Sequence, residues 1–451
     1  KERKEMNSRE IALKVLMDVH QNGAFSNYSI SKYLKGREDV KGENLIREIV
    51  YGVIENALYL DYIISKLSKV KIEKIDPKIL EILRIGVYQM AFMDRIPHRA
   101  AVNESVNLAK KYGHKGTVGF TNGILRNFSR NKEELMKIDV KDKLDYLSIK
   151  YSYPRWMVER WVKEFSLEFT EELLVSNNSK PMLNIRVNTL KLRRDELKRI
   201  LSDYGYTVYN TEYASDGLIV EDPVRITETE EFNKGYFTIQ DESSMLVAQI
   251  LSPAENSVVL DLCSAPGGKS THAGQIMNNK GKIISLDIYE HKLKLVRENA
   301  ERLGITIIET GIHDAQELNK NMVEMADYCI VDAPCSGLGI IKRRPEIKWN
   351  RKEEDIKDLA DMQKKILNNA GKYLKPGGVM VYSTCTIEKA ENMDVIQDFL
   401  MKNRNFKLSG FENFLCSTRN ADTAEKGYVQ LFPNVHGTDG FFIARLIKEN
   451  I

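Results

Sequence analysis

Apolar residues between residues 8 and about 130 recur every three or four positions, a spacing typical of amphipathic helices. Residues 11–19 carry one such stripe. Asp76-Pro77 begins another helix, since an acidic cap and a proline at the first helical position favour a helix start. Further helices are predicted over 101–112 and 117–130. The pattern predicts an all-α N-terminal domain of five to seven helices.

The spacing changes after residue 130. Residues 131–150 are charged and lack a clear period, so we interpret them as a linker. The pattern that follows, over 151–235, favours a small α+β module, with helices near 154–165, 170–177 and 194–204 and strands at 183–187 and within 206–220. A basic run in this module suits either phosphate contact or an ordinary solvated helix face, and it comprises Lys191, Arg193, Arg194, Lys198 and Arg199.

From residue 236 onward, short apolar runs alternate with helical stretches. Such an alternation predicts a parallel sheet with helices on both faces. Two final apolar runs, 428–432 and 440–446, follow each other without a predicted helix and favour an antiparallel hairpin that closes the sheet. The other predicted strands are 258–262, 282–286, 305–309, 328–331 and 378–382, and the predicted helices are 289–303, 353–374 and 388–402.

The length of 451 residues exceeds what a single hydrophobic core serves, so two or three domains are expected. A content of 42% hydrophobic and 29% charged residues is ordinary for globular protein. The net charge of +3 neither requires nor excludes a nucleic-acid partner, so local clusters must decide. The charged start, Lys1–Glu5, predicts no signal peptide, and the lack of a run of about 18 apolar residues predicts no membrane span.

Five cysteines without a CxxC pair argue against a disulfide framework or a zinc site and fit a reducing cytoplasm. Two of them, Cys335 and Cys385, each follow a predicted strand. Because ligands bind beyond the carboxyl ends of strands in such sheets, we expect both thiols to face one crevice. One thiol there suggests a nucleophile, and two suggest a covalent step that is made and then undone. Cys329 is interpreted as core and Cys263 as loop packing, whereas Cys416 has no interpretation.

A glycine-rich loop, Asp261–Ser270, joins a predicted strand to a helix, an arrangement that lets a ligand approach the backbone closely. The loop is not a P-loop, because the first glycine of that motif would fall on Cys263, and it lacks GxGxxG. Asp287 ends the second strand, where a carboxylate can bind ribose hydroxyls, and Asp314 follows the third, where it can meet a base edge. Each acid alone fits a helix cap or a surface charge equally well. Together with the loop they favour a cationic nucleoside without phosphate, S-adenosylmethionine.

Four segments at the predicted strand ends stand out: DLCSAPGGK at 261–269, DAPCSG at 332–337, RRPEIKW at 343–349 and STCT at 383–386. In this order they resemble the motifs of RNA cytosine-5 methyltransferases. The helical front, with AVNESV at 101–106 and FTNGILR at 120–126, is similar to a NusB-type RNA-binding domain, which narrows the match to the bacterial Sun, or RsmB, branch. The resemblance covers nearly the whole chain. Thr386 stands where the family usually has serine, and both residues carry a hydroxyl.

The resemblance implies an α/β fold: a class I, Rossmann-like methyltransferase domain over 236–451, preceded by an all-α NusB-like domain over 1–140 and a small α+β, RRM-like module over 145–235. It implies methyl transfer from S-adenosylmethionine to carbon 5 of a cytosine in small-subunit ribosomal RNA, at cytosine 967 in this branch. A monomeric cytoplasmic enzyme without a metal or a membrane partner is expected. The implied cofactor-binding residues are Cys263, Ser264, Ala265, Pro266, Gly267, Gly268, Lys269, Asp287, Asp314 and Asp332.

This reaction needs an activated cytosine, because carbon 5 is a poor nucleophile. A thiolate that adds to carbon 6 makes an enamine, whose carbon 5 then attacks the sulfonium methyl. Lys269 is a candidate for lowering the thiol pKa, and Asp332 for holding N3 and N4 of the pyrimidine. Spacing leaves the roles of the thiols open, since a Pro-Cys nucleophile is the pattern of DNA cytosine-5 enzymes and nominates Cys335. The resemblance to the RNA family implies instead that Cys385 is the nucleophile and that Cys335 assists product release.

The target base must leave its stack for this chemistry. A segment after the fourth strand mixes cations with an indole, which suits phosphate contact and base stacking, although a solvated loop with a core tryptophan fits as well. Rival functions are an RNA-binding ribosome-assembly factor with an inactive methyltransferase domain, an antitermination factor, a DNA cytosine-5 enzyme, and a cytosine-5 transferase acting on another RNA. The predicted RNA-binding residues are Lys342, Arg343, Arg344, Lys348 and Trp349.

Overall fold

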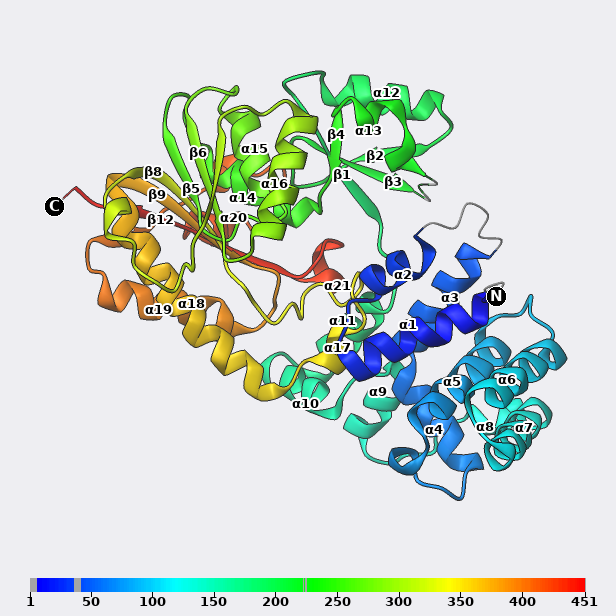
Figure 1. Ribbon diagram of the computed structural model, residues 1–451. Coiled ribbons are helices and arrows are strands. Elements are labelled where there is room, and N and C mark those ends of the chain that lie inside the picture. The colour runs from blue at the N-terminus through cyan, green and yellow to red at the C-terminus, as the bar shows by residue number, and fades with distance from the viewer. Residues whose placement is uncertain (1–5, 36–41, 222, 224, 451) are drawn as a thin grey trace. The chain divides into compact units, whose positions relative to one another are not determined.

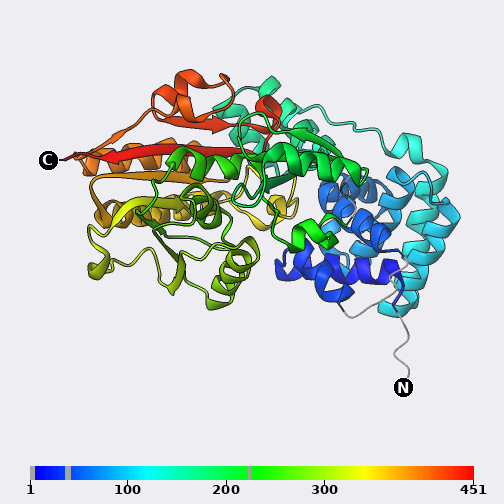
Figure 2. The ribbon, with the colours of Figure 1, turned by 90° about the horizontal axis from the view of Figure 1, so that it is seen from above.

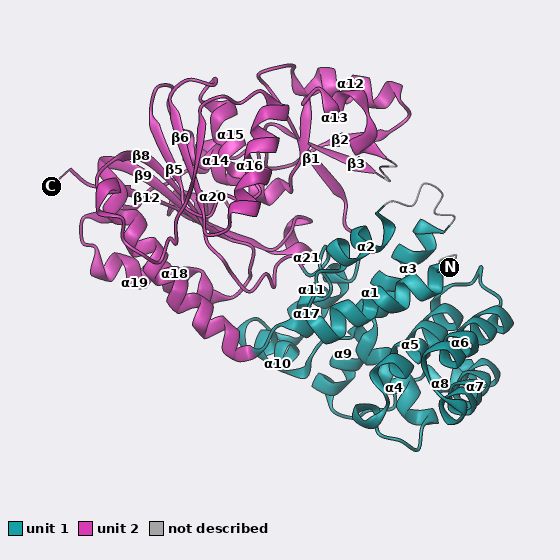
Figure 3. Cartoon of the chain, viewed as in Figure 1, with its two compact units in different colours: residues 1–179, 341–352 teal, residues 180–340, 353–451 magenta. Residues whose placement is uncertain are grey.

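The computed structural model describes residues 6–450 apart from 36–41, 222 and 224. The chain forms two compact units, shown in Figure 3. The first comprises residues 1–179 and 341–352, and the second comprises residues 180–340 and 353–451. The short segment 341–352 therefore belongs to the first unit, although its neighbours in sequence belong to the second.

The first unit is helical. The predicted all-α domain ends near residue 140, but this unit also contains residues 155–177, whose helices the apolar pattern predicts as part of the α+β module. Its helices are α1 (Ser8–Asn22), α2 (Ser26–Leu34), α3 (Glu43–Glu55), α4 (Ala57–Leu67), α5 (Pro77–Phe92), α6 (His98–Tyr112), α7 (Lys115–Arg130), α8 (Lys132–Leu135), α9 (Lys143–Tyr151), α10 (Arg155–Glu164), α11 (Leu167–Asn177) and α17 (Ile347–Asn350). The central helix is α5, which packs against α1, α3, α4, α6 and α7. Its predicted start is confirmed: the Asp76 side chain accepts hydrogen bonds from the N–H groups of Lys78 and Ile79, and Pro77 takes the first helical position.

The linker predicted over 131–150 is wrong for residues 132–135, which form α8, and for residues 143–150, which belong to α9. The Asp142 side chain caps this helix by accepting a hydrogen bond from the N–H of Asp145 at 2.9 Å, and α9 packs against α4 and α10. Only Leu147 and Ser148 of the helix are buried. A helix with so few buried positions leaves a weak period in the sequence, and its N-cap and its packing stabilise it instead.

The second unit contains a small antiparallel sheet of four strands in the order β2-β3-β1-β4. Its strands are β1 (Leu183–Val187), β2 (Thr207–Asn210), β3 (Gly217–Glu221) and β4 (Phe237–Ile239). The helices α12 (Arg194–Asp203) and α13 (Glu230–Asn233) accompany it (Figure 1). Ile185, Leu197 and Val220 share one apolar cluster, so the predicted strand and helix of this module pack together.

The larger sheet of this unit has eight strands, in the order β10-β12-β9-β8-β5-β6-β7, with β11 pairing β12. The strands are β5 (Val258–Asp261), β6 (Lys282–Asp287), β7 (Ile308–Ile312), β8 (Ala326–Asp332), β9 (Leu374–Thr384), β10 (Phe406–Leu408), β11 (Tyr428–Leu431) and β12 (Phe441–Lys448). The five strands β9-β8-β5-β6-β7 run parallel, and β12 is antiparallel to β9. The strand order reverses between β5 and β8, which is the switch point where ligands bind in such sheets.

Helices cover both faces of this sheet, as predicted (Figure 1, Figure 2). Side chains alternate along each strand, so Leu260 packs in the cluster with α18 (Glu353–Tyr373) and α19 (Met393–Lys402), whereas Val259 packs in the cluster with α14 (Glu242–Leu251) and α15 (Gly268–Ile276). A further helix, α16 (Glu290–Leu303), follows β6. These three layers make the Rossmann-like fold.

Two predicted elements differ from the structure. β7 begins at Ile308 rather than at residue 305, because Ile305 packs with Ala300 and Leu303 of α16 before the strand starts. The predicted antiparallel hairpin of β11 and β12 is confirmed, but a short helix, α21 (Pro433–His436), lies in its connection. No helix within the described residues is long and apolar enough to cross a bilayer.

Candidate active site

The two motif cysteines lie side by side. β8 and β9 are parallel neighbours, with Asp332 opposite Ser383 near their carboxyl ends. Cys335 and Cys385 follow these ends within three and two residues, respectively, and their Sγ atoms are 3.1 Å apart. Both are free thiols and half-buried. The two sulfur atoms are therefore in contact, and Cys385 lines a cavity beside the glycine-rich loop, whereas Cys335 is not among its lining residues.

A buried carboxylate fixes the two cysteine loops. Glu391 accepts hydrogen bonds from the N–H of Ser336 at 2.8 Å and from Nε2 of Gln363 at 2.9 Å. Gln363, on α18, also donates to the carbonyl of Pro334 at 2.9 Å. The loops are joined directly as well, since the hydroxyls of Ser336 and Thr386 are 2.9 Å apart. Burial raises the pKa of the Glu391 carboxyl, although the hydrogen bonds from Ser336 and Gln363 oppose this shift.

Lys269 and Asp332 form an ion pair beside the thiols. Lys269 Nζ is 2.6 Å from Asp332 Oδ2, and the Ser383 hydroxyl donates to Asp332 Oδ1 at 2.8 Å. Burial opposes the charge on Lys269, but the Asp332 carboxylate outweighs it and raises the pKa of the ammonium. The lysine therefore stays protonated at neutral pH, as a fixed positive charge next to the reacting groups.

The thiol of Cys335 is held in its neutral form. Its hydrogen bond with Cys385 and its burial raise its pKa well above the ordinary value, and the carboxylates of Glu391 and Asp332 add to the shift. A thiol with a raised pKa is a proton donor rather than a nucleophile at neutral pH.

A cavity of about 280 Å³ lies beside these groups, entirely within the second unit. Residues of the glycine-rich loop and Cys385, which follows β9, both line it. A ligand bound at the loop would therefore share the cavity with a thiol. Its walls are formed by Ile239, Gln240, Asp241, Ser243, Ser244, Cys263, Ser264, Ala265, Pro266, Gly268, Lys269, Asp332, Ile340, Cys385, Asp439 and Phe441.

The glycine-rich loop is shaped to receive a ligand. Gly267 has φ +99° at the start of α15, and an added Cβ would lie 3.1 Å from Val296 Cα, so only glycine fits there without strain. Asp261 Oδ1 and Ser264 Oγ are buried and have no hydrogen-bond partner among the described residues. Burial raises the pKa of Asp261 to about 7. Unsatisfied buried polar atoms at this loop fit a polar ligand such as S-adenosylmethionine, which would satisfy them.

The two acids expected to hold the nucleoside lie at the same edge of the sheet but outside the walls of this cavity. Asp287 ends β6 and accepts a hydrogen bond from the N–H of Tyr289. Asp314 follows β7, is exposed, and caps the turn at Gln316. The N–H of His313 donates to the Asp287 carbonyl, which places the ends of β6 and β7 side by side.

Of the residues predicted to bind RNA, Lys348 is buried in the first unit and Trp349 is half-buried there. Lys348 donates to the carbonyls of Glu55 and Ser152 and to Asn178 Oδ1, each at 3.1 Å. Burial lowers its pKa to about 7. Trp349 Nε1 donates to the carbonyl of Ile54 at 2.8 Å. Both side chains anchor their own segment. The enclosed ammonium of Lys348 does not reach solvent, which corrects the expectation that it contacts RNA, whereas the RNA role of the half-buried Trp349 stays a prediction.

The same anchoring presents a cation at the surface. Glu346 is buried and accepts hydrogen bonds from the N–H and hydroxyl of Ser26. Arg344, two residues earlier, is exposed, and its guanidinium carbon lies 5.0 Å from the ring centre of Phe25, which is half exposed. Lys342 and Arg343 are half-buried. The exposed guanidinium and ring are groups that suit phosphate and base contact.

The remaining sequence expectations concern cysteines and metals. Cys329 is buried inside β8, as expected, and Cys263 lines the cavity. Cys416 is exposed. Within the described ranges, no group of three or more His, Cys, Asp or Glu side chains is placed to hold a metal ion.

Sequence reasoning missed Glu391, Gln363 and Gln240. Each is a polar residue in an ordinary local context, and its role depends on partners 28 to 55 residues away. The one signal available was Glu391 itself, an acid at the start of a predicted helix, and that position also suits a solvated helix end.

Family models match three parts of the chain. Residues 248–447 match 16S rRNA methyltransferase RsmB/F, residues 6–130 match the NusB family, and residues 153–227 match the ferredoxin-like domain of RsmF/B-like methyltransferases. The chain is also similar to a probable ribosomal RNA small subunit methyltransferase B of Bacillus subtilis, with 37% identity over 99% of this chain and 100% of that protein.

Solved structures agree with these matches. A methyltransferase homolog protein from Pyrococcus horikoshii has a TM-score of 0.60 and 30% identity, and the match covers 68% of this chain and 100% of that chain. NSun6 from Pyrococcus horikoshii, solved with SFG, has a TM-score of 0.56 and 25% identity, and the match covers 65% of this chain and 97% of that chain. SFG is an analogue of S-adenosylmethionine.

Proposed function

The chain belongs to the RsmB/F family of 16S rRNA methyltransferases, and from this premise we propose that it methylates carbon 5 of a cytosine in small-subunit ribosomal RNA. As a member of this family it is an RNA methyltransferase that uses S-adenosylmethionine. The observation that carries the proposal is the pair of sulfur atoms 3.1 Å apart, one of which lines the cavity of the glycine-rich loop. The proposed target is cytosine 967, in the cytoplasm, with the enzyme as a monomer.

In the proposed mechanism, Cys385 is the nucleophile. Its thiolate adds to carbon 6 of the flipped cytosine, and carbon 5 gains the electron density that lets it attack a methyl group. Lys269, protonated and beside the thiols, stabilises the thiolate by its charge. Asp332, held by Lys269 and Ser383, is placed to accept a hydrogen bond from N4 or a protonated N3 of the pyrimidine.

Cys335 acts at the end of the reaction. After methyl transfer, a water molecule takes the proton from carbon 5. The electron pair of that C–H bond forms the carbon 5–carbon 6 double bond, and the carbon–sulfur bond breaks to release Cys385 as a thiolate. The neutral thiol of Cys335, 3.1 Å from the departing sulfur, stabilises that thiolate by donating a hydrogen bond. This division of labour agrees with the raised pKa of Cys335.

S-adenosylmethionine supplies an electrophilic methyl group when it is bound. We assign the loop residues Cys263, Ser264, Ala265, Pro266, Gly267 and Gly268, with Lys269 and Asp332, to its binding. Seven of these eight residues, all but Gly267, line the cavity, and the Ser264 hydroxyl there is unsatisfied. Asp287 is proposed for the ribose hydroxyls and Asp314 for the base, from their positions after β6 and β7.

RNA binding is proposed for the basic segment of the first unit. Arg344 and the ring of Phe25 form an exposed cation–aromatic pair, and Lys342 and Arg343 precede it in the chain. Stacking on an aromatic ring and charge attraction to phosphate both favour single-stranded RNA with a splayed base.

Trapping the covalent intermediate tests the proposal. Cys335→Ala is incubated with 16S rRNA and S-adenosylmethionine and run on a denaturing gel. A stable protein–RNA adduct should accumulate with Cys335→Ala, because release is blocked, and none should form with Cys385→Ala. Cys416→Ala is the matched control for loss of a thiol and should methylate like the unchanged protein.

Two outcomes would contradict this assignment. An adduct with Cys385→Ala and none with Cys335→Ala would exchange the roles of the cysteines. Absence of methyl transfer into any RNA would favour an RNA-binding assembly factor instead. Bisulfite sequencing of 16S rRNA from cells with and without the protein identifies the methylated position and tests cytosine 967 directly.

A further inference from the structure

We propose that Arg186, in the small four-stranded sheet, is a positioning residue for the methyl donor: it fixes the turn at Gly268 and orients the Gln240 amide so that its nitrogen binds the donor's carboxylate. The proposal deepens the cofactor assignment above and rests on it. It makes the small sheet a part of the cofactor site and adds Gln240 to the residues that touch the ligand.

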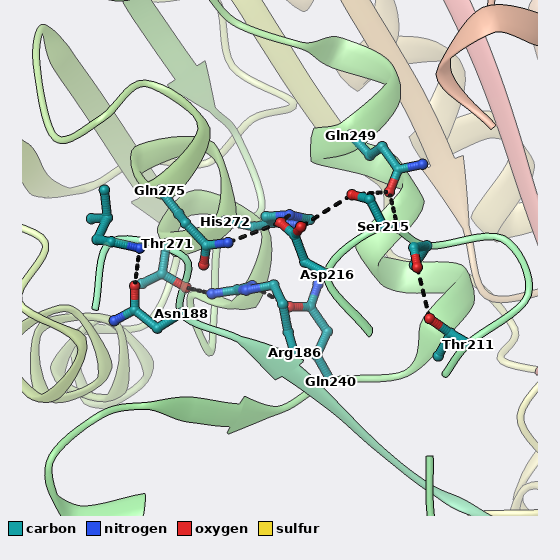
Figure 4. A network of polar contacts seen from close by, with 12 residues as sticks. Arg186, Asn188, Thr211, Ser215, Asp216, Gln240, Gln249, Thr271, His272 and Gln275 are labelled. Atoms are coloured by element: carbon teal, nitrogen blue, oxygen red, sulfur yellow. Dashed lines mark hydrogen bonds and ion pairs between the residues drawn. The ribbon is translucent and has the colours of Figure 1, made fainter. Parts of the chain in front are cut away.

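The guanidinium of Arg186 is buried between the small sheet and α15. Arg186 lies on β1 and is 1% exposed. It donates to Gln240 Oε1 and to the Thr271 hydroxyl at 3.0 Å (Figure 4). It also donates to the carbonyl of Gly268 at 2.5 Å. Gly268 and Thr271 form the first turn of α15, directly after the glycine-rich loop. The Arg186 side chain therefore fixes the backbone at the carboxyl end of the glycine-rich loop.

Burial of the Arg186 guanidinium costs free energy, because the charge is removed from water. All three acceptors are uncharged groups, and the Asp216 carboxylate acts on the guanidinium from a longer distance. Burial lowers the pKa of Arg186 to about 9. Removing an arginine from water without a directly paired anion is unfavourable. Apolar side chains would pack the small sheet against α15 at a lower cost in free energy.

A second residue of the small sheet holds the same helix. Asp216, just before β3, accepts a hydrogen bond from Gln275 Nε2 at 2.9 Å and lies 3.4 Å from His272 Nε2 (Figure 4). Arg186 thus fixes the first turn of α15 and Asp216 fixes its later turns. A helix held at both ends gives the loop before it a defined conformation, which lowers the cost of binding a ligand there.

The Gln240 amide is oriented by this network. Its oxygen accepts from Arg186, so its nitrogen carries two N–H donors to the other side of the amide. Gln240 lines the cavity, and its nitrogen lies 3.5 Å from the Ser244 hydroxyl, another residue of the cavity wall. The amide lies beside Gly268 of the loop, where an added Cβ would be 3.6 Å from Gln240 Cδ. A donor at this point of the cavity suits the carboxylate at the amino-acid end of S-adenosylmethionine.

Binding of two probes tests the proposal without RNA. S-adenosylhomocysteine carries the carboxylate, and 5′-methylthioadenosine lacks the amino-acid end. Their dissociation constants are measured by titration calorimetry with the full chain. Gln240→Glu keeps an acceptor for Arg186 but places a negative charge toward the carboxylate. It should weaken S-adenosylhomocysteine by about tenfold or more, the effect of losing one charge-assisted hydrogen bond, and 5′-methylthioadenosine by less than about twofold.

The Arg186 variants test the coupling. Arg186→Met should weaken S-adenosylhomocysteine more than 5′-methylthioadenosine. In the double variant with Gln240→Glu, the preference for S-adenosylhomocysteine over 5′-methylthioadenosine should fall no further than in the worse single variant, because this preference depends on one amide. Arg186→Lys keeps the charge and guards against loss of folding. Arg302→Met is the matched control: Arg302 donates to the carbonyls of Phe232 and Phe237 and to Thr238, and it should bind both probes as the unchanged protein does.

Equal weakening of both probes by Gln240→Glu, or additive effects of the two substitutions, would overturn the proposal. If the unchanged protein binds neither probe, the cofactor assignment itself fails. If it binds both but methylates no RNA, the rRNA proposal fails while the role of Arg186 and Gln240 stands.

Discussion

Lys348 has its ammonium group inside the helical unit, surrounded by three oxygen acceptors. It also lies 4.0 Å from the ring centre of Tyr153. The cations of this segment predict an RNA-binding surface. Lys348 points inward, however, and stabilises the segment that carries the exposed Arg344. The identity of a residue shows its chemistry, and only its surroundings show whether that chemistry reaches solvent.

Replacing Lys348 by methionine should change how stability depends on pH. The folded-state pKa is about 7 and the ordinary value is 10.5, so between these values the unfolded chain binds a proton that the folded chain does not. The contribution of Lys348 to the free energy of unfolding therefore rises with pH from 7 to about 10. The difference in this free energy between the unchanged protein and Lys348→Met, from denaturant titrations at several pH values, should rise over that window. A constant difference would contradict the lowered pKa.

Glu391 is expected to matter for catalysis although it lies outside the motifs. Glu391→Ala removes the acceptor of Ser336 and Gln363, so the Cys335 loop loses its position against Cys385. A misplacement of about 1 Å costs on the order of a hundredfold in rate. Single-turnover kinetics should show slow release and some accumulated adduct. Glu391→Gln keeps an acceptor oxygen, so its release rate should lie between those of Glu391→Ala and the unchanged protein. A Glu391→Ala variant with a normal release rate would exclude the positioning role.

At the scale of elements, the unit of β5, the loop and α15 was predictable because strand, glycines and helix follow each other in sequence. A substitution at Gly267 tests how much the conformation of this loop depends on glycine. Gly267→Ala should lower affinity for S-adenosylhomocysteine by about tenfold, since φ +99° and the close approach to Val296 force the loop to shift. Gly205→Ala, at φ +88° with open space around it, meets the same strain without crowding. It should lower the melting temperature without changing affinity, and equal affinities for both variants would contradict the role of Gly267.

The strands that hold the cysteines were predicted closely, because β8 and β9 are buried on both faces and read as continuous apolar runs. The helix over 143–151 was missed because only two of its residues are buried. The cysteine pair could be predicted from strand ends, since parallel neighbours bring their ends together. The positions of Glu391, Gln363 and Arg186 could not, because contacts between segments far apart in sequence leave no mark in either segment alone.

At the scale of the whole molecule, RNA affinity should depend on salt through the basic segment. Arg344→Ala should reduce the slope of log K against log salt by about 0.7 to 1, the share of one phosphate contact. Phe25→Ala should weaken binding with the slope unchanged, because a stacking ring releases no counterion. Lys402→Ala, an exposed cation on α19, is the control and should change neither. Fluorescence anisotropy with a 16S rRNA fragment at several salt concentrations measures both quantities.

Residues 341–352 belong to the first unit, although in sequence they lie between two parts of the second. A polypeptide ending at residue 179 would leave the carbonyls of Ile54 and Glu55 without Trp349 and Lys348. A fragment of residues 1–179 therefore lacks donors that its own carbonyls use, and we expect it to unfold at a lower temperature than the same fragment supplied with residues 341–352.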